Sequence, residues 1–469
     1  MQFKVFKNTV LLFVLVLISC ASKVKDEKTE ITTNDELLKQ IHVDGKTKTE
    51  DRGQNTGSIN PESKQPKLNN QQPTTNNQQP AIIVGANQTE AYLPLLKGKR
   101  VGIVANQTSV IFKDQNPKPK TQNLSYTHLV DSLIALKVNV KTVFAPEHGF
   151  RGTADAGELI KDGIDTKTGV PIVSLYGANK KPKLEQLKET KKYASDINEG
   201  VTQIDIMVFD LQDVGARFYT YISTLHYVME ACAEANIPVL ILDRPNPNGH
   251  YIDGPILEME NKSFVGMHPI PVVYGMTIGE YAQMINGEKW LKNGIQCELK
   301  VIPIKNYTHQ MSYSLPIKPS PNLPNDASIN LYPSLCFFEG TNVSVGRGTN
   351  TQFQVFGSPF LDKTIFTYSF TPKPNEGAKQ PPFQDKVCYG MNLAHVKNVS
   401  NLNLNWLLSA YKNTKNKAEF FTPFFTKLAG TKKLQQQIEA GLSEEVIKAS
   451  WQQGLESFKK TRNKYLLYK

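Results

Sequence analysis

The stretch Val138–Gly152, VNVKTVFAPEHGFRG, decides the fold class because it joins an apolar run directly to a polar loop. The run Val138–Phe144 predicts a buried strand, which a proline and a glycine then end. An acid, an imidazole and a guanidinium follow, at Glu147, His148 and Arg151. Because ligands of open α/β sheets bind at the carboxyl ends of the strands, this order predicts an α/β fold with a site at that edge. The alternative is a solvated loop in which the acid and the guanidinium only pair with each other.

Apolar runs and amphipathic stretches alternate on both sides of this loop. Runs typical of strands lie at residues 101–105, 138–144, 170–175, 204–209, 237–242 and 297–304. Apolar residues at helical spacing lie at residues 126–136, 184–194, 219–235 and 277–286. Apolar strands separated by helices are typical of a mostly parallel sheet with helices on both faces. We therefore expect a Rossmann-like domain over residues 81–306.

The pattern changes beyond residue 307. Five prolines crowd residues 316–333, and residues 340–357 mix glycine with valine, phenylalanine and threonine in short β-like pieces. Residues 404–411 and 434–447 then have helical patterns. We infer a second, smaller α+β domain over residues 307–469, packed against the first.

Residues 1–20 are typical of a bacterial lipoprotein signal, in which lysines precede an apolar run and Cys20 follows it. The run is too short to span a bilayer comfortably, which favours cleavage before Cys20 and lipidation of its thiol; an uncleaved anchor is the alternative. Residues 21–80 are rich in Lys, Thr, Asn, Gln and Pro and predict a disordered polar tether. We expect a membrane-anchored lipoprotein of the bacterial cell envelope, periplasmic or surface-exposed.

Several well-known cofactor-binding, metal-binding and catalytic sequence motifs are absent from the chain. It has no GxGxxG after the first strand, no Walker loop, no HExxH and no GxSxG, so we expect neither a cofactor nor a metal site. The formal net charge is +11, which suits an anionic cell envelope. No basic run is interleaved with aromatic residues, and nucleic acid is therefore not an expected partner.

Polar residues also follow three other predicted strands. They are Asn106 after the first strand, Asp210, Asp213, Arg217 and Tyr219 after the strand at 204–209, and Asp243, Arg244 and Asn246 after the strand at 237–242. Because parallel strands end at one edge of a sheet, we expect these residues to gather there. The alternative for Asp213 with Arg217, and for Asp243 with Arg244, is an ion pair that only holds a turn.

Nine separated strings carry a resemblance to a known family: FAPEHGFRG at 144–152, SLYG at 174–177, FDLQDVGARFYTYISTL at 209–225, LDRPNPNGHYIDGPILE at 242–258, PVVYGMTIGEYAQMING at 271–287, SPNLPN at 320–325, YPSLCFFEGTNVSVGRGT at 332–349, FQVFGSPF at 353–360 and RNKYLLYK at 462–469. In this order they resemble the exo-β-N-acetylmuramidase family, glycoside hydrolase family 171. The resemblance covers essentially all of the chain after the tether. It implies a Rossmann-like domain followed by a C-terminal domain, with the active site in the cleft between them. It also implies release of N-acetylmuramic acid (MurNAc) from the non-reducing end of peptidoglycan fragments (muropeptides), such as the disaccharide with N-acetylglucosamine (MurNAc-GlcNAc).

Glycoside hydrolysis requires a carboxylic acid that protonates the leaving oxygen and a second group that stabilises an oxocarbenium-like centre. Glu147 is the predicted acid, and we expect its neighbour His148 to contact the sugar. Asp210 and Asp213 are the candidates for the second group, either as a base toward water or by orienting the 2-acetamido group of the substrate. The resemblance leaves this choice open.

The lactyl ether of MurNAc adds a carboxylate that N-acetylglucosamine lacks. Arginine binds carboxylates through two parallel hydrogen bonds, and the candidates for this role are Arg151, Arg217, Arg244 and Arg347. Arg347 lies between two glycines, where the backbone can approach a ligand closely. Other predicted sugar-binding residues are Asn106, Asp243, Asn246 and Glu339, together with the aromatic residues Tyr176, Tyr219, Tyr221 and Phe356.

Two other functional classes compete with the muramidase. A non-catalytic, muropeptide-binding lipoprotein on the same fold would keep the arginine and aromatic contacts but tolerate loss of Glu147. An amidase or esterase of the cell wall would need a metal cluster or an activated serine.

Overall fold

The protein is described by a computed structural model that covers residues 80–113, 125–152, 158, 161–188, 203–397 and 399–469. All of these described residues belong to one compact unit. The predicted lipoprotein signal, Cys20 and the predicted tether up to residue 79 lie outside the described residues.

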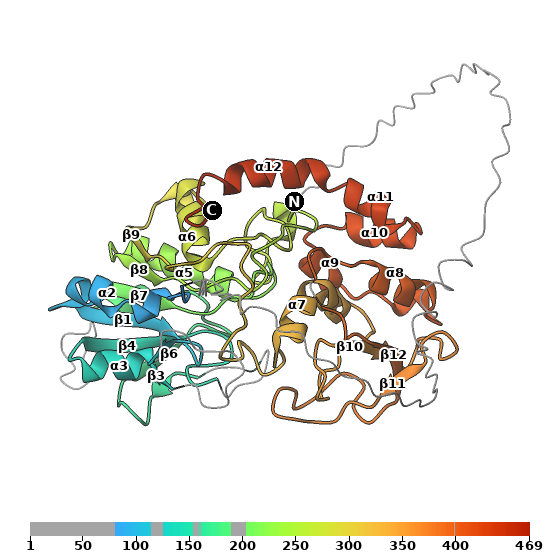
Figure 1. Ribbon diagram of the computed structural model, residues 1–469, viewed down its shortest axis with the longest axis horizontal. Helices are drawn as coiled ribbons and strands as arrows, with labels where there is room; N and C mark the ends of the chain where they lie inside the picture. The colour runs from blue at the N-terminus through green and yellow to red at the C-terminus, as the bar shows by residue number, and fades with distance from the viewer. Residues whose placement is uncertain (1–79, 114–124, 153–157, 159–160, 189–202, 398) are drawn as a thin grey trace, which may run out of the picture. The chain divides into compact units, whose positions relative to one another are not determined.

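Among the described residues, seven strands form the central sheet in the order β5-β6-β4-β1-β7-β8-β9 (Figure 1). Neighbouring strands run parallel except for β5, which is antiparallel to β6. The arrangement confirms the mostly parallel sheet expected from the sequence. The strands span Arg100–Ala105 (β1), Asn139–Ala145 (β4), Gly163–Ile164 (β5), Pro171–Ser174 (β6), Ile206–Asp210 (β7), Val239–Leu242 (β8) and Leu299–Ile302 (β9).

Helices cover both faces of the sheet because alternate strand residues point to opposite sides. In β1, Ile103 belongs to the hydrophobic cluster formed with α2 and α3. The next residue, Val104, belongs to the cluster formed with α4, α5 and α6. Burial on both faces explains the nearly continuous apolar runs of these strands. The helices span Thr89–Leu96 (α2), Leu129–Ala135 (α3), Leu184–Leu187 (α4), Tyr221–Glu234 (α5) and Ile278–Gly287 (α6).

The C-terminal part combines a small antiparallel sheet with helices, as expected (Figure 1). In the described part of the chain this sheet has three strands, in the order β10-β12-β11: Val355–Ser358 (β10), Tyr368–Phe370 (β11) and Cys388–Asn392 (β12). Its helices span Asp326–Leu335 (α7), Asn405–Lys412 (α8), Phe424–Ala429 (α9), Lys433–Glu439 (α10), Glu444–Ala449 (α11) and Gln452–Arg462 (α12). Short 3-10 helices span Gly85–Asn87 (η2), Met259–Asn261 (η4), Lys292–Gly294 (η5), Cys336–Gly340 (η6) and Lys417–Glu419 (η7).

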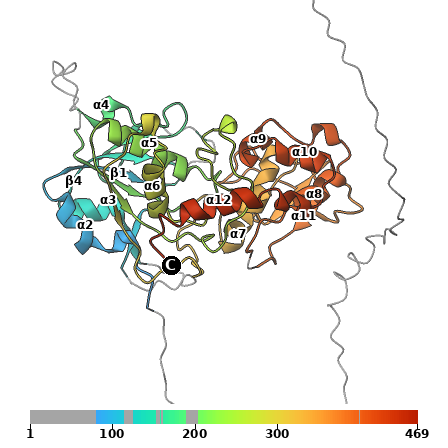
Figure 2. The ribbon, with the colours of Figure 1, turned by 90° about the horizontal axis from the view of Figure 1, so that it is seen from above.

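Helix α12 runs from the C-terminal part back toward α6 (Figure 2). The residues after it bond to the Rossmann-like part. Tyr465 Oη donates to Glu288 Oε1 at 2.7 Å, and Tyr468 Oη donates to Asp243 Oδ2, just after β8, at 2.6 Å. The backbone N–H of Tyr468 also donates to Glu280 Oε1, in α6, at 3.2 Å. The Rossmann-like part is therefore completed by residues that follow the C-terminal part in the chain.

The helix expected at 126–136 starts later in the structure. Tyr126–His128 forms a strand, β3, that pairs antiparallel with β2, Val110–Phe112. The helix α3 begins after His128, whose Nδ1 accepts a hydrogen bond from the N–H of Val130 at 3.3 Å. The apolar spacing predicts α3 correctly. It does not predict β3, because these three residues pair with β2, a strand that lies earlier in the chain and outside the helical pattern.

Other expected elements are shorter than predicted. The helix expected at 434–447 is two helices, α10 and α11, because Gly441 between them has a φ of 73°, which ends a helix. Within 340–357 the only described strand is the start of β10. Of the helix expected at 184–194, α4 covers its first four residues, and residues 189–194 lie outside the described part.

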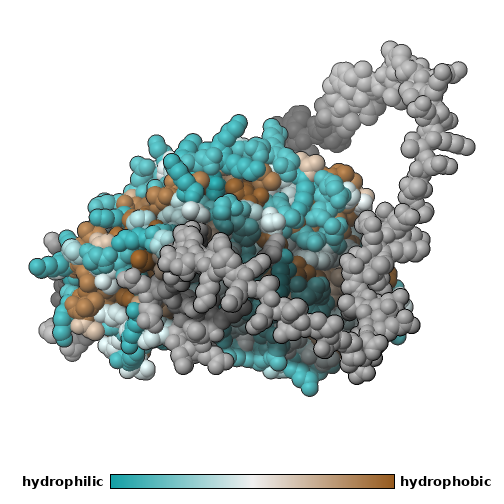
Figure 3. All heavy atoms as spheres, in the orientation of Figure 1, coloured by the Kyte–Doolittle hydropathy of each residue, from teal (hydrophilic) through white to brown (hydrophobic). Residues whose placement is uncertain are grey.

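None of the described helices is long and apolar enough to span a membrane. In α12, Leu455 and Phe458 are buried, and Figure 3 shows hydrophilic residues along the upper edge where this helix lies. Hydrophobic residues form small separate groups on the face shown in Figure 3.

Candidate active site

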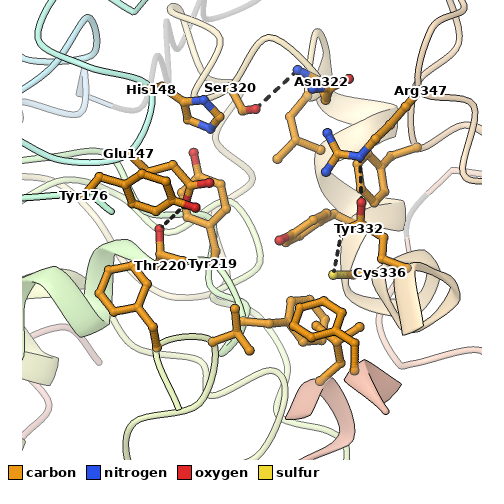
Figure 4. Close-up of a pocket in the computed structure, with 18 residues that line it drawn as sticks. Glu147, His148, Tyr176, Tyr219, Thr220, Ser320, Asn322, Tyr332, Cys336 and Arg347 are labelled. Carbon is orange, nitrogen blue, oxygen red and sulfur yellow. Dashed lines mark hydrogen bonds and ion pairs between the residues drawn. The ribbon is translucent and has the colours of Figure 1, made fainter. Parts of the chain in front are cut away.

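The candidate site lies at the carboxyl edge of the sheet, where the strand order reverses. From β1 the chain passes to β4 and β6 on one side and later to β7, β8 and β9 on the other. The loops after β4 and β7 therefore diverge, as they do at ligand sites of open α/β sheets. Glu147 follows β4 and Thr220 follows β7, and both line a pocket of about 180 Å³ with Tyr332 and Arg347 of the C-terminal part (Figure 4).

Glu147 is half-buried in one wall of this pocket. Its Oε2 accepts a hydrogen bond from Thr220 Oγ1 at 2.7 Å. The phenol of Tyr176 lies beside it (Figure 4), and burial together with the Glu147 carboxylate raises the pKa of Tyr176. Because Thr220 is the N-cap residue of α5, this helix fixes the direction of the carboxyl group. Glu147 is thus a positioned carboxyl group in a partly closed pocket.

His148 adopts an uncommon backbone conformation beside the acid. Its φ is 69°, in the left-handed region, and Gly149 follows with a φ of 77°. The turn is closed by a hydrogen bond from the N–H of Gly149 to the carbonyl of Pro146 at 3.0 Å. A left-handed conformation is costly for a residue with a side chain and is concentrated at functional sites. Here it directs the buried imidazole into the pocket lining next to Glu147.

The opposite wall carries an ion pair. Arg347 Nε donates to Glu339 Oε1 at 2.6 Å, and the guanidinium lies 5.2 Å from the ring centroid of Phe353. Burial lowers the pKa of Arg347, but the Glu339 carboxylate outweighs burial and raises it above its usual value. Among the described residues, the two terminal nitrogens of Arg347 have no hydrogen-bond partner, and Figure 4 shows them on the pocket side of the ion pair. They are placed to receive an anion.

The other three candidate arginines do not line this pocket. Arg151 pairs with Asp131 at 3.0 Å and with Asp165 at 2.7 Å. Arg244 Nε donates to Asp210 Oδ1 at 2.6 Å, with both side chains buried. These pairs suit structural roles, since each guanidinium binds its carboxylate through Nε and a terminal nitrogen together, whereas Arg347 uses Nε alone.

Arg217 has a different environment, with a fully buried side chain. Its Nη1 donates to the carbonyls of Pro255 and Ile270 at 2.7 Å each. Its Nη2 donates to the carbonyls of Leu428 and Ala429 at 2.9 and 2.7 Å. Burial lowers the pKa of Arg217 to about 9. This guanidinium therefore connects the Rossmann-like part to the end of α9, rather than to a ligand.

The aspartates predicted as the second catalytic group do not line the pocket either. Asp210 is bound by Arg244, as described above. Asp213 Oδ2 accepts hydrogen bonds from the N–H of Gly215 at 2.7 Å and from Tyr274 Oη. Its Oδ1 is buried without a partner among the described residues, and burial raises the pKa of this carboxyl to about 7. The described carboxylates that line the pocket are Glu147 and Glu339.

Three further predicted sugar-binding residues do not line the pocket, and their side chains form hydrogen bonds with other residues of the protein. Asn106 Nδ2 donates to Tyr221 Oη at 2.6 Å. Asp243 Oδ2 accepts from Thr277 Oγ1 at 2.7 Å, and burial raises the pKa of Asp243 to about 6. Asn246 Nδ2 donates to the carbonyl of Met276 at 2.9 Å.

The predicted aromatic residues divide between the pocket and the core. Tyr176 and Tyr219 line the pocket, and Tyr219 Oη donates to the carbonyl of Pro319 at 2.8 Å. Tyr221 lies beneath it, with ring centroids 4.8 Å apart. Phe356 stacks on Phe338 in the core of the C-terminal part.

Several lining residues were not predicted from the sequence. They come from separate segments: Thr220, Phe264 and Val265, Ser320 and Asn322, Phe353, and Phe424 with Leu428. Thr220 and the pair Ser320–Asn322 lie inside strings that carry the family resemblance, so those strings held a usable signal. Phe264 and Phe424 have no local signal, because only the tertiary fold brings their segments together.

No described group of three or more His, Cys, Asp or Glu side chains could hold a metal ion. The described cysteines, Cys232, Cys297, Cys336 and Cys388, are buried free thiols.

Replacing Asp213 by asparagine is expected to change how stability depends on pH. The folded state raises the pKa of this carboxyl from 3.8 to about 7, so between these values the folded protein keeps a proton that the unfolded chain releases. The wild-type unfolding free energy should therefore fall as pH rises through this window, by about 3 kcal/mol from this group. Urea unfolding from pH 4.5 to 7.5 should show the variant gaining stability relative to wild type. A pH-independent difference would contradict this assignment.

Comparisons with known proteins show which family the chain belongs to. Residues 101–327 match the family described as "Exo-beta-N-acetylmuramidase NamZ, N-terminal", and residues 330–468 match its C-terminal counterpart. The peptidoglycan beta-N-acetylmuramidase NamZ of Bacillus subtilis (strain 168) is 39% identical over 397 residues, which cover 80% of this chain and 89% of the relative.

Two crystal structures of DUF1343 family proteins from Bacteroides fragilis NCTC 9343 are also similar. One is 46% identical with a TM-score of 0.70 and covers 83% of this chain and 99% of its own. The other is 28% identical with a TM-score of 0.66 and covers 83% of this chain and 100% of its own. The resemblance found in the sequence is confirmed: the chain belongs to the exo-β-N-acetylmuramidase NamZ family.

Proposed function

We propose that this protein is an exo-acting β-N-acetylmuramidase that hydrolyses non-reducing terminal MurNAc from peptidoglycan fragments during cell-wall turnover or recycling. The observation that carries the proposal is one pocket with Glu147 on one wall and the Arg347–Glu339 pair on the other. A glycosidase needs the first as a proton donor, and recognition of the lactyl carboxylate needs the second. Membership of the NamZ family supports the same substrate.

In this proposal Glu147 protonates the glycosidic oxygen as the bond to the anomeric carbon breaks, and a water molecule then bonds to that carbon and releases the proton that restores the acid. Thr220 and Tyr176 hold the carboxyl group in the direction of that oxygen. His148, buried beside it, contacts the bound sugar. Arg347 binds the lactyl carboxylate through its terminal nitrogens, while its Nε bond to Glu339 fixes the plane of the guanidinium.

The direct test compares two chromogenic substrates that differ only in the lactyl ether. Purified protein should release the chromophore from the β-N-acetylmuraminide and not from the matching β-N-acetylglucosaminide. Binding of muropeptides without turnover of the muraminide would favour the non-catalytic lipoprotein. Cleavage of an amide or ester bond would favour the other class of cell-wall hydrolase.

Replacing Arg347 by methionine is expected to lower kcat/KM for the muraminide by about 10²-fold or more. Methionine keeps much of the volume but leaves the lactyl carboxylate in a buried pocket without its cation. The preference for the muraminide over the glucosaminide should fall in parallel, and the ratio of the two kcat/KM values is the measurement. Arg151→Met is the matched control, because its guanidinium is already paired with Asp131 and Asp165. An unchanged preference in Arg347→Met would show that another group recognises the lactyl carboxylate.

We also propose that the protein is a lipoprotein anchored to a membrane of the bacterial cell envelope through Cys20. The support is the sequence alone: an apolar run preceded by lysines, and a cysteine with small neighbours. Replacing Cys20 by serine removes the thiol to which the lipid would be attached. The variant should be released from the membrane fraction, and its signal should be uncleaved or miscleaved. It should still hydrolyse the muraminide. Fractionation and mass spectrometry of the mature N-terminus make this measurement, and unchanged membrane association of a processed form would contradict it.

A further inference from the structure

The pocket differs in burial and in chemistry from one group of lining residues to another. His148, Ser320 and Asn322 are polar lining residues with exposed fractions of 4%, 5% and 1%. Phe264, Val265, Phe424 and Leu428 are apolar lining residues, and Phe424 is 43% exposed. Apolar side chains that are grouped at a pocket, and not scattered singly over the surface, are typical of ligand-binding grooves. Figure 4 shows the three polar residues together, and we call this group the polar end of the pocket. The turn at residues 263–266 lies beside α9, since a Cβ on Gly266 would be 3.7 Å from the carbonyl oxygen of Lys427, so the apolar residues form a second group, the aromatic end.

Phe264 is held firmly although it is only partly buried. It lies at the tip of a tight turn in which Ser263 and Gly266 exchange backbone hydrogen bonds at 2.8 and 3.1 Å. Its ring stacks on Tyr227 at an interplanar angle of 17° and lies 6.1 Å from the ring of Tyr176. Because the phenol of Tyr176 lies beside Glu147, Phe264 is separated from the acid by a single aromatic ring.

Phe424 is fixed from the other part of the chain. It is the first residue of α9, and Leu428, one turn later, lines the same pocket. The carbonyl of Leu428 accepts a hydrogen bond from the buried Arg217, which belongs to the Rossmann-like part. The two phenylalanines are thus presented by separate segments on supports that are already ordered, so a ligand would meet them without a large entropic cost.

We propose that Phe264 and Phe424 form the binding site for the leaving-group sugar, the N-acetylglucosamine that follows the terminal MurNAc. This inference rests on the muramidase function proposed above. A pyranose ring has an apolar face of C–H groups that packs well on an aromatic ring, and the position one ring from Glu147 is where the leaving oxygen must emerge. The non-reducing end of MurNAc then points to the polar end, whose lining residues are buried, as exo action requires.

The test varies the leaving group while the MurNAc ring is kept constant. MurNAc-GlcNAc has a sugar that can reach the two phenylalanines, whereas the β-fluoride of MurNAc has none. Phe424→Ala and Phe264→Ala are measured on both substrates. Phe360→Ala is the matched control, because Phe360 is 39% exposed, packs on Phe383 and does not line the pocket.

We expect each pocket variant to lower kcat/KM for MurNAc-GlcNAc by about tenfold, chiefly through KM, with a much smaller loss on the fluoride. The control should match wild type on both. Equal losses on the two substrates would overturn the proposal, since the phenylalanines would then act on the MurNAc ring or on the fold. An unchanged kcat/KM for the disaccharide would overturn it as well.

A third substrate separates a leaving-group sugar from a peptide. If the variants lose activity only on a disaccharide that carries a stem peptide, the aromatic end binds that peptide and the proposal is wrong. Failure of the wild-type protein to cleave either MurNAc substrate would refute the muramidase function itself, which is a distinct outcome.

Discussion

Replacement of Glu147 by glutamine is expected to lower kcat for MurNAc-GlcNAc by about 10³-fold or more, with the fold unchanged. The amide has the shape of the carboxyl group and can still accept the hydrogen bond from Thr220 Oγ1, but it cannot give a proton to the leaving oxygen. The loss should be much smaller on the β-fluoride of MurNAc, because fluoride leaves without needing a strong proton donor. This contrast between two leaving groups identifies the proton donor more directly than loss of activity alone.

The control for this experiment is Glu90→Gln, which removes a charge from an exposed side chain that forms a 3.5 Å ion pair with Lys305. It should retain wild-type kinetics on both substrates. Thermal unfolding of both variants checks that the fold is retained. Near wild-type kcat in folded Glu147→Gln would remove Glu147 from the role of acid.

Replacement of Arg217 by methionine should give the largest loss of stability, about 3–5 kcal/mol in the free energy of unfolding. Four carbonyl oxygens accept hydrogen bonds from this guanidinium within the described chain, and methionine leaves all of them buried without a donor. Arg217→Lys should recover part of the loss, because an ammonium group can serve at most three of the four acceptors. Urea unfolding followed by circular dichroism is the measurement.

Arg100→Met is the matched control for stability. The side chain of Arg100 is 37% exposed and that of its partner Asp205 is 25% exposed, so solvent reaches this ion pair. Its loss should cost about 1 kcal/mol or less. A cost for Arg217→Met no greater than for this control would show that water replaces the guanidinium at the four carbonyls.

The order of strands and helices was predictable because it depends on local patterns. Burial on both faces makes parallel strands apolar throughout, and a polar loop after such a strand marks the edge where sites form. The segment 138–152 contains both signals, and the structure places Glu147 and His148 in the pocket lining. Arg347 was also open to prediction, because it lies between two glycines in the sequence, and the structure gives both Gly346 and Gly348 a φ of 78°.

The sequence could not show which arginine faces the pocket. Arg217 and Arg244 have the same polar neighbours in the sequence as a binding arginine would have. Their partners are backbone carbonyls up to 212 residues away and an aspartate on the next strand, and neither relationship leaves a local pattern. The sequence could not show the roles of Asp210 and Asp213 either, because a buried structural carboxylate and a catalytic one have the same sequence neighbours before the fold is known.

The hydrogen bond from Tyr468 to Asp243 joins residues 225 positions apart and has a consequence for the order in which the chain can fold. During synthesis the strands and helices up to α6 emerge first, yet Asp243 and Glu280 obtain the Tyr468 contacts only after the C-terminal part has been made. Contacts of such long range form late and slow folding. The Rossmann-like part therefore obtains its last contacts from residues that the ribosome adds after the C-terminal part. A chain that ends within α12 would lack the hydrogen bonds that Tyr468 donates to Asp243 and Glu280, although the strands of the sheet would all be present.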